Sequence, residues 1–185
     1  MNFREADKAD AEGIASLHAT SWRFAYRGSL SDAYLDGPIE AERSAFWRGR
    51  FERPAENQFM VVAEFMGKLV GFACAYGGED LKWGTFLDNL HVAPERHRKG
   101  IGARLMAEVA SWSAAAFPGQ GIYLWVLESN RRARRFYERV GAEIGGRDLW
   151  TPPDGTALPK LRLVWRSAGE LSAGVADIPL DESAA

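Results

Sequence analysis

A glycine-rich turn between a strand pattern and a helix pattern is the part of the sequence best suited to binding an anion. The apolar stretch 86–92 stops at Pro94, and the segment 100–102, Gly-Ile-Gly, opens a helix with apolar residues at helical spacing. Backbone N–H groups of such a turn point at one spot, and the helix N-terminus adds partial positive charge. The loop also carries three basic residues, Arg96, Arg98 and Lys99. The stretch therefore predicts a site for a phosphate group.

Two common phosphate-binding motifs do not fit this turn. A P-loop requires G-x-x-x-x-G-K-[ST], which the sequence lacks, and a dinucleotide fingerprint requires glycine where Leu105 stands. The run 97–102, H-R-K-G-I-G, instead resembles the acetyl-CoA loop of the GNAT acetyltransferase superfamily, Arg/Gln-x-x-Gly-x-Gly/Ala. His97 stands where that pattern has arginine or glutamine. A nucleotide-phosphate binder is the alternative, and it requires ATP or NAD to compete for the loop.

A second motif follows the apolar run 121–127, which is typical of a strand buried on both faces. Residues 130–142 read N-x-x-A-x-x-F-Y-x-x-x-G-A and resemble the GNAT signature N-x-x-A-x-x-F-Y-x-x-x-G-F. The resemblance implies that Asn130 binds the pantetheine region of coenzyme A and that Tyr137 protonates the departing thiolate. The alternative for Tyr137 is a core aromatic with its hydroxyl satisfied locally.

The resemblance also assigns roles along the central strand. It implies a β-bulge that turns the backbone N–H of Leu90 toward the thioester oxygen, while Val92 pairs with the cofactor. Asp88 is the candidate general base, and bonding to nearby backbone is its alternative role. Strand alternation places Asn89 and His91 on the opposite face from Asp88 unless the bulge shifts the register. The implied cofactor-binding residues are Leu90, His91, Val92, Arg98, Lys99, Gly100, Ile101, Gly102, Ala103, Asn130, Ala133, Phe136 and Tyr137.

The N-terminal helices are aromatic-rich, and their pattern W-R-x-x-Y-R-G is similar to that of one GNAT branch. Trp22 and Tyr26 are the candidate substrate-binding residues, with core packing as the alternative. His18 is expected to be a partly buried helix residue rather than a metal ligand. The basic run of residues 131–139 is either a solvated helix face or a contact for the 3′-phosphate of coenzyme A.

These motifs lie on an alternating series of strands and helices. Asp7 and Asp10 predict a capped helix, and a second helix is expected to reach Phe51 with a kink near 37–38. The resemblance implies an α/β (α+β) fold with a mixed, mostly antiparallel sheet of six or seven strands and about four helices. Residues 1–166 would form this domain, and the polar, acidic segment 167–185 is expected to be a flexible tail. The expected strands are 2–6, 58–65, 68–76, 85–93, 121–127, 143–150 and 158–166.

Composition narrows the class of protein further. A chain of 185 residues with 46% hydrophobic and 26% charged residues is typical of one globular domain. Its net charge of −2 argues against a nucleic-acid partner, and no apolar run is long enough for a membrane span. Cys74 is expected to be buried and inert, and no Cys/His spacing indicates a metal site. We expect a cytoplasmic protein, and the sequence leaves a monomer and a homodimer open.

The resemblance implies an enzyme that transfers an acetyl group from acetyl-CoA to an amine in a ternary complex. The alternative is a regulatory module that binds acyl-CoA without transfer. The sequence does not distinguish between a small molecule and a peptide as the amine acceptor.

Overall fold

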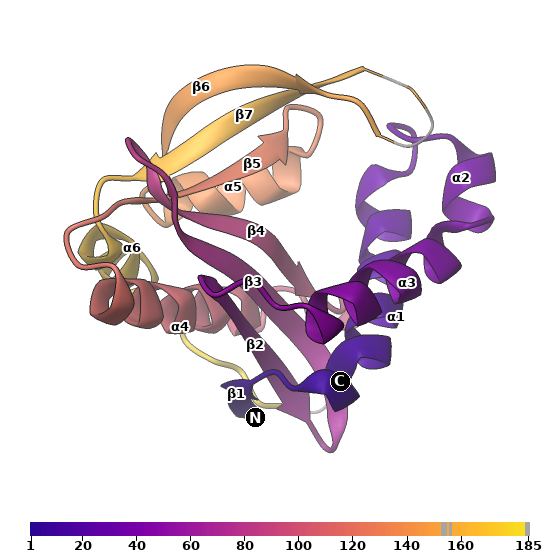
Figure 1. The fold of residues 1–185 in the computed structure, drawn as a ribbon, viewed down its shortest axis with the longest axis horizontal. Coiled ribbons are helices and arrows are strands. Elements are labelled where there is room, and N and C mark those ends of the chain that lie inside the picture. Colours follow the sequence, from indigo (N-terminus) through magenta and orange to yellow (C-terminus); the bar gives the residue numbers. More distant parts are fainter. Residues whose placement is uncertain (153–154, 156, 184–185) are drawn as a thin grey trace.

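The computed structural model describes residues 1–152, 155 and 157–183. Its centre is a seven-stranded sheet in the order β1-β2-β3-β4-β5-β7-β6 (Figure 1). The strands are β1 (Asn2–Glu5), β2 (Gln58–Phe65), β3 (Lys68–Asp80), β4 (Gly84–Val92), β5 (Ile122–Leu127), β6 (Glu143–Trp150) and β7 (Leu158–Trp165). Neighbouring strands pair antiparallel except β4 and β5, which run parallel. The predicted fold class and mostly antiparallel sheet are confirmed.

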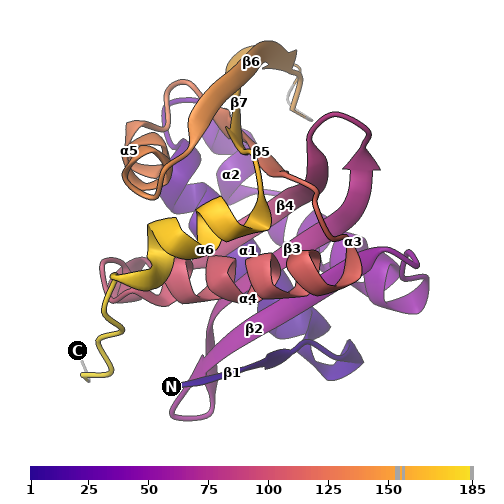
Figure 2. The same ribbon diagram turned by 90° about the vertical axis from the view of Figure 1, so that its left-hand side faces the viewer.

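Helices cover both faces of this sheet. They are α1 (Ala11–Tyr26), α2 (Asp32–Asp36), α3 (Ile39–Glu52), α4 (Ile101–Ala116), α5 (Arg131–Arg139) and α6 (Ala168–Ala176), with 3₁₀ turns η1 (Lys8–Asp10) and η2 (Pro94–Arg96). Figure 2 shows α4 and α6 on one side of the sheet and α1 and α3 on the other. The described residues thus form more helices than the four expected, because the second helix breaks at Gly37-Pro38 and the chain end adds α6.

The start of the first helical segment follows the predicted cap. The Asp7 carboxylate accepts from the Ala9 N–H at 2.7 Å, and Asp10 accepts from the Asp7 N–H at 2.8 Å. These two bonds satisfy backbone donors that would otherwise lack partners. Asp10 also pairs with Arg4 of β1 at 2.7 Å, so the cap ties the helix to the edge of the sheet.

The flexible tail expected over 167–185 is wrong for α6. Ala168, Leu171 and Val175 recur at i, i+3 and i+7, and this apolar stripe is buried in the same core as α4. Ser167 caps the helix by accepting from the Glu170 N–H at 3.1 Å. The segment is polar on average, so its composition did not indicate the apolar stripe or the helix. Residues 184–185 lie outside the described part of the chain, as do 153–154 and 156 of the predicted β6–β7 loop.

The rest of the chain end lies against the predicted cofactor loop. The Asp181 N–H donates to the Lys99 carbonyl at 3.0 Å, and the Lys99 ammonium pairs with the Asp181 carboxylate at 2.6 Å. The Lys99 ammonium also donates to the Ser183 hydroxyl at 2.8 Å, and the Arg96 guanidinium donates to the Ser183 carbonyl at 2.8 Å. The chain end therefore packs on the loop through both backbone and side chains.

Candidate active site

The predicted anion-binding turn connects β4 to α4. Gly100 occupies the N-cap position in the left-handed region, with φ of 78°, and no side chain caps the helix. The Arg104 N–H bonds to the Gly100 carbonyl, so the N–H groups of residues 101–103 precede the first intrahelical donor. Arg98 is also left-handed, at φ of 65°, which is unusual for a residue with a side chain. This geometry leaves a helix N-terminus open to an anion.

Basic side chains gather beside this turn from α5. The Arg132 guanidinium lies 5.4 Å from the Phe24 ring, and the His97 ring packs against the same phenylalanine at 5.4 Å. Burial lowers the pKa of Arg132, and the nearby positive charge of Arg98 lowers it further. Two guanidinium groups close to each other favour an anion between them. Within the basic run of residues 131–139, Arg132 is therefore the member placed beside the loop.

Beyond their first residues, β4 and β5 separate. They pair only at Thr85–Ile122 and Phe86–Tyr123. The Ala93 N–H bonds to the Val70 carbonyl and so faces β3. The backbone groups of successive residues in a strand point to opposite neighbours. Counting back from Ala93, the N–H and C=O groups of Val92 and Leu90 therefore point toward the side of β5.

This exposed edge of β4 is where the pantetheine arm was expected. The Val92 carbonyl accepts from His97 Nε2 at 3.0 Å, which supports its outward direction. No residue in the described ranges pairs with Leu90 from the β5 side. The role of its N–H at the thioester oxygen stays a prediction.

The β-bulge implied by the family pattern lies at Asp88. On β3, Ala75 pairs with Leu87 and its neighbour Cys74 pairs with Asn89, so Asp88 is the extra residue. The bulge overturns simple alternation, because Asp88 and Asn89 now share the face toward α3. Asp88 Oδ2 accepts from Asn89 Nδ2 at 2.6 Å and from Arg50 at 2.6 Å.

Tyr137 lies on α5, near the separated strands. Its side chain is 8% exposed and packs against Phe136 and Trp165, with ring centroids 5.4 and 6.3 Å away. None of the described residues bonds to its hydroxyl. Burial raises the pKa of Tyr137, and the nearby Tyr26 adds to this effect, so the hydroxyl keeps its proton near neutral pH. A core role and a proton-donor role are thus both compatible with its position.

Asn130 closes the N-terminus of α5. Its Oδ1 accepts from the Ala133 N–H at 3.1 Å. The amide nitrogen has no partner among the residues described, so it can donate to a ligand while the oxygen caps the helix. Ala133 and Phe136 of the same motif pack against the main core.

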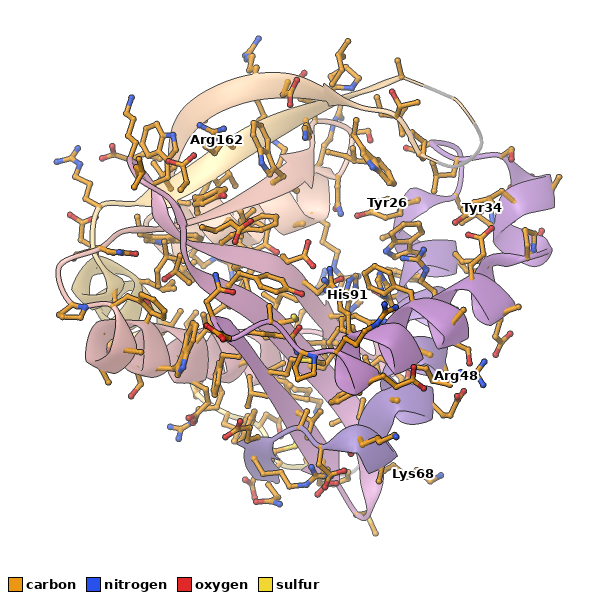
Figure 3. All side chains as sticks on the ribbon, viewed as in Figure 1. Tyr26, Tyr34, Arg48, Lys68, His91 and Arg162 are labelled. Carbon is orange, nitrogen blue, oxygen red and sulfur yellow. The ribbon has the colours of Figure 1, made fainter. Side chains whose placement is uncertain are left out.

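The other face of the sheet carries the predicted substrate-binding aromatics. The Trp22 ring is 9% exposed and lies 5.4 Å from Tyr26 and 5.7 Å from Trp150 of β6. Trp22 therefore contributes mainly packing, whereas Tyr26 at the end of α1 is less buried. Figure 3 shows Tyr26 extending from α1 toward the β5–β6–β7 half of the molecule. Burial raises the pKa of Tyr26 to about 12, so it is neutral.

Two histidines lie beside each other on this face (Figure 3 labels His91). Their ring centroids are 4.4 Å apart, and burial lowers both pKa values, that of His91 to about 3. His18 Nδ1 accepts from Trp47 Nε1 at 3.0 Å, and His91 Nδ1 shares a hydrogen bond with Ser21 at 2.8 Å. Both rings are therefore neutral, and His18 is a buried helix residue as expected, more deeply buried than the sequence indicated.

Three other predictions concern the reactivity of Cys74, a metal site and a membrane-spanning helix. Burial raises the pKa of the Cys74 thiol to about 12, which makes it a poor nucleophile, as expected. Across the described residues, no group of His, Cys, Asp and Glu is arranged to hold a metal ion. The helices described there are also too short or too polar to cross a bilayer.

Sequence reasoning missed the arginines of α3. Arg43 and Arg50 are seven residues apart and thus share a helix face, and both lie close to the rings of Phe46 and neighbouring aromatics. The signal was available as the heptad spacing of two basic residues around Trp47, on a helix face otherwise expected to be apolar. The sequence alone did not show that Asp88 of β4 forms an ion pair with Arg50.

Comparisons with known proteins agree with this geometry. Residues 15–142 match the family model "Acetyltransferase (GNAT) family". The chain is 29% identical to a probable N-acetyltransferase of Mycobacterium tuberculosis, over 91% of this chain and 95% of the relative. It is 32% identical to the N-acetyltransferase YhfO of Bacillus subtilis, over 77% of this chain and 90% of the relative.

A solved structure shares the fold. The PaiA N-acetyltransferase of Thermoplasma acidophilum, in complex with coenzyme A, matches with a TM-score of 0.68 at 19% identity, over 86% of this chain and 96% of that one. The matched segment of the family model contains both the turn before α4 and the motif of α5. The chain therefore belongs to the GNAT family of acetyl-CoA-dependent N-acetyltransferases.

Proposed function

We propose that this enzyme transfers the acetyl group to a primary amine by direct attack in a ternary complex. The observation that carries the proposal is the edge of β4 at residues 90–92, which no described strand pairs with on the side of β5 and which leads to the N-terminus of α4. Such an edge can hold an extended pantetheine arm by backbone hydrogen bonds. The same arrangement leaves the face with Asp88 for the acceptor.

Residues on three elements would hold acetyl-CoA. The N–H groups of residues 101–103 would bind the pyrophosphate, and Arg98 and Arg132 would neutralise phosphate charge. The Asn130 amide nitrogen would donate to the pantetheine arm, and Val92 would pair with it through its backbone. The Val92 carbonyl has two lone pairs, so it can accept from a ligand while His97 keeps its bond.

Two groups would stabilise the charge that develops during transfer. The Leu90 N–H would donate to the oxyanion formed when the amine attacks, an effect typically worth about 10²–10³ in rate. Tyr137 would donate its proton to the departing thiolate, and general acid help is typically worth about 10²–10⁴. Burial keeps Tyr137 protonated, so this donor is present at working pH.

The attacking amine must lose a proton. Asp88 is the proposed general base and would take this proton directly or through a water molecule. Its Oδ2 is occupied by Arg50 and Asn89, whereas Oδ1 has no partner in the described part of the chain. The ion pair with Arg50 therefore fixes the carboxylate while one oxygen stays available.

Release of the coenzyme A thiol, measured with a panel of primary amines, tests the proposal. Initial rates with both substrates varied should give intersecting lines for a ternary complex. Parallel lines would indicate a covalent intermediate and overturn direct attack. Tight acetyl-CoA binding with no transfer to any amine would instead support a regulatory module.

A variant pair tests the cofactor loop. Gly102→Val should abolish acetyl-CoA binding, because its side chain would block close approach to the loop. Gly49→Val is the matched control, since Gly49 is also helical and a Cβ there meets nothing within 4 Å. Undiminished affinity in a folded Gly102→Val enzyme would refute the loop assignment.

A further inference from the structure

A guanidinium group without an acidic partner lies over the acceptor face. Arg43 of α3 sits 4.8 Å from the centroid of the Trp22 ring and 4.8 Å from that of Phe46. Its Nε is buried and unbonded, and no described residue forms a salt bridge or hydrogen bond with the side chain. The neighbouring Glu42 accepts from the Tyr34 hydroxyl at 2.7 Å instead.

The surroundings of Arg43 offset its charge only in part. Arg50 is paired with Asp88 at 2.6 Å, so that carboxylate is already shared with another guanidinium. His18 and His91 are neutral. Burial lowers the pKa of Arg43 and Arg50 lowers it further; Tyr34, Glu42 and Asp88 raise it without reversing the effect of burial, which indicates an unfavourable site for an unpaired cation. Aromatic rings compensate such a charge only in part.

Glu42 and Asp88 both lie near enough to act on Arg43, but neither is paired with it, so the Arg43 guanidinium has no bonded counter-ion among the described residues. Arg43 is close enough to His91 of β4 to lower the pKa of that ring, so its guanidinium lies near the strand that carries Asp88 and Leu90. A planar guanidinium binds a carboxylate through two parallel hydrogen bonds. One carboxylate, bound at the terminal nitrogens, would give this guanidinium the bonded counter-ion that the described residues do not provide.

We propose that the amine acceptor also carries a carboxylate, as an amino acid does, and that Arg43 binds that group. The inference rests on the proposed function, because it assigns this face of β4 to the acceptor. Arg43 acts in binding and orientation, while the attacking nitrogen reaches the carbonyl from the side of Asp88.

Matched acceptor pairs provide the test. Release of the coenzyme A thiol at saturating acetyl-CoA is measured with each common amino acid and with its amino alcohol, which keeps the amine and side chain but lacks the carboxylate. For the best substrate we expect kcat/KM to favour the amino acid by about 10- to 100-fold, the range of a hydrogen bond to a charged group. The difference should lie mainly in KM, because the carboxylate contact is the same before and during the reaction.

Three variants assign the preference to a residue. In Arg43→Gln the preference should fall to near unity, while turnover of the amino alcohol and acetyl-CoA affinity stay as in the wild type. Arg48→Gln is the control on the same helix, because Arg48 is 59% exposed and lies on the outer side of α3 (Figure 3). Arg162→Gln is a second control, because Arg162 of β7 also lacks an acidic partner among described residues, and is surrounded by Trp83, Tyr123 and Trp125.

Each possible result of these assays either supports or overturns the proposal. Equal use of both members of every pair, or a preference that survives Arg43→Gln, would overturn the proposal. Loss of the preference in Arg162→Gln alone would also overturn it. If other amines are acetylated but no carboxylate-bearing one is, the proposal fails and the proposed function stands. If no amine of any kind is acetylated, both fail.

Discussion

Deleting the chain after Arg166 should destabilise the protein strongly, because the deletion removes α6. Leu171 is fully buried and Val175 is 5% exposed in the main core. Full burial of each side chain is worth about 1.5–3 kcal/mol, so the two together contribute about 3–6 kcal/mol. For a domain of this size each kcal/mol lowers Tm by about 2–4 °C. The truncated enzyme should therefore melt about 6–24 °C below the full chain.

Thermal melts followed by circular dichroism, with urea titrations at one temperature, measure this effect. Leu171→Ala alone should cost about 2–5 kcal/mol, and Ser172→Ala, at an exposed position of the same helix, should cost little. A truncation after Arg166 that melts within about 3 °C of the full chain would refute the reasoning. A truncation after Asp177 keeps α6 and removes the contacts to Lys99. It should lower Tm less than the truncation after Arg166, because it removes only the partly buried Ile178 and Leu180 from the main core, and it should weaken acetyl-CoA binding.

Other variants test the site directly. Tyr137→Phe should lower turnover by about 10²–10⁴ with little change in acetyl-CoA affinity, and unchanged turnover would remove Tyr137 from the mechanism. Arg132→Ala should weaken acetyl-CoA binding several-fold, less so at high salt, whereas the exposed Arg139→Ala should not; equal calorimetric affinities would contradict this. His18 and His91 are neutral in the fold, so the unfolded chain binds more protons below about pH 6.5, and Tm should fall as pH drops toward 4.5. His91→Gln should flatten that slope, and an unaltered slope would show that His91 is not responsible.

The turn before α4 and the start of α5, where we propose that the cofactor binds, could be located from the sequence because their determinants are local. The turn at Gly100 and the cap at Asn130 each depend on residues within a few positions along the chain. The spacing of those residues can therefore be read from a single sequence. The strands were placed well for the same reason, since alternation and turn residues act over short distances. The family resemblance implied a bulge that turns the N–H of Leu90, but its position at Asp88 and its effect on Asn89 required the register of β3.

The contacts of the proposed acceptor side could not be predicted, although Asp88, Trp22 and Tyr26 were candidates, because they join distant segments. Asp88 of β4 meets Arg50 of α3, and His91 meets Ser21 of α1, over separations that leave no periodic signal. Trp22 illustrates the difficulty, since an aromatic on an amphipathic helix is compatible with both core and pocket. The helix α6 was missed for another reason: its three apolar residues are diluted among small and acidic ones.

The chain end and the cofactor loop depend on each other through Gly100. A Cβ on Gly100 would lie 2.2 Å from the Pro179 carbonyl oxygen, so the segment after α6 touches the loop where it turns into the helix. Left-handed backbone at Arg98 is unfavourable by about 1–2 kcal/mol. Asp181 bonds to both the carbonyl and the ammonium of Lys99, and these two bonds help to hold Arg98, which precedes Lys99, in that conformation. Substitution of Gly100 would thus disturb the docked chain end as well as phosphate access. Gly102, whose Cβ position lies no closer than 3.7 Å to its neighbours, is therefore the cleaner position at which to separate cofactor binding from folding.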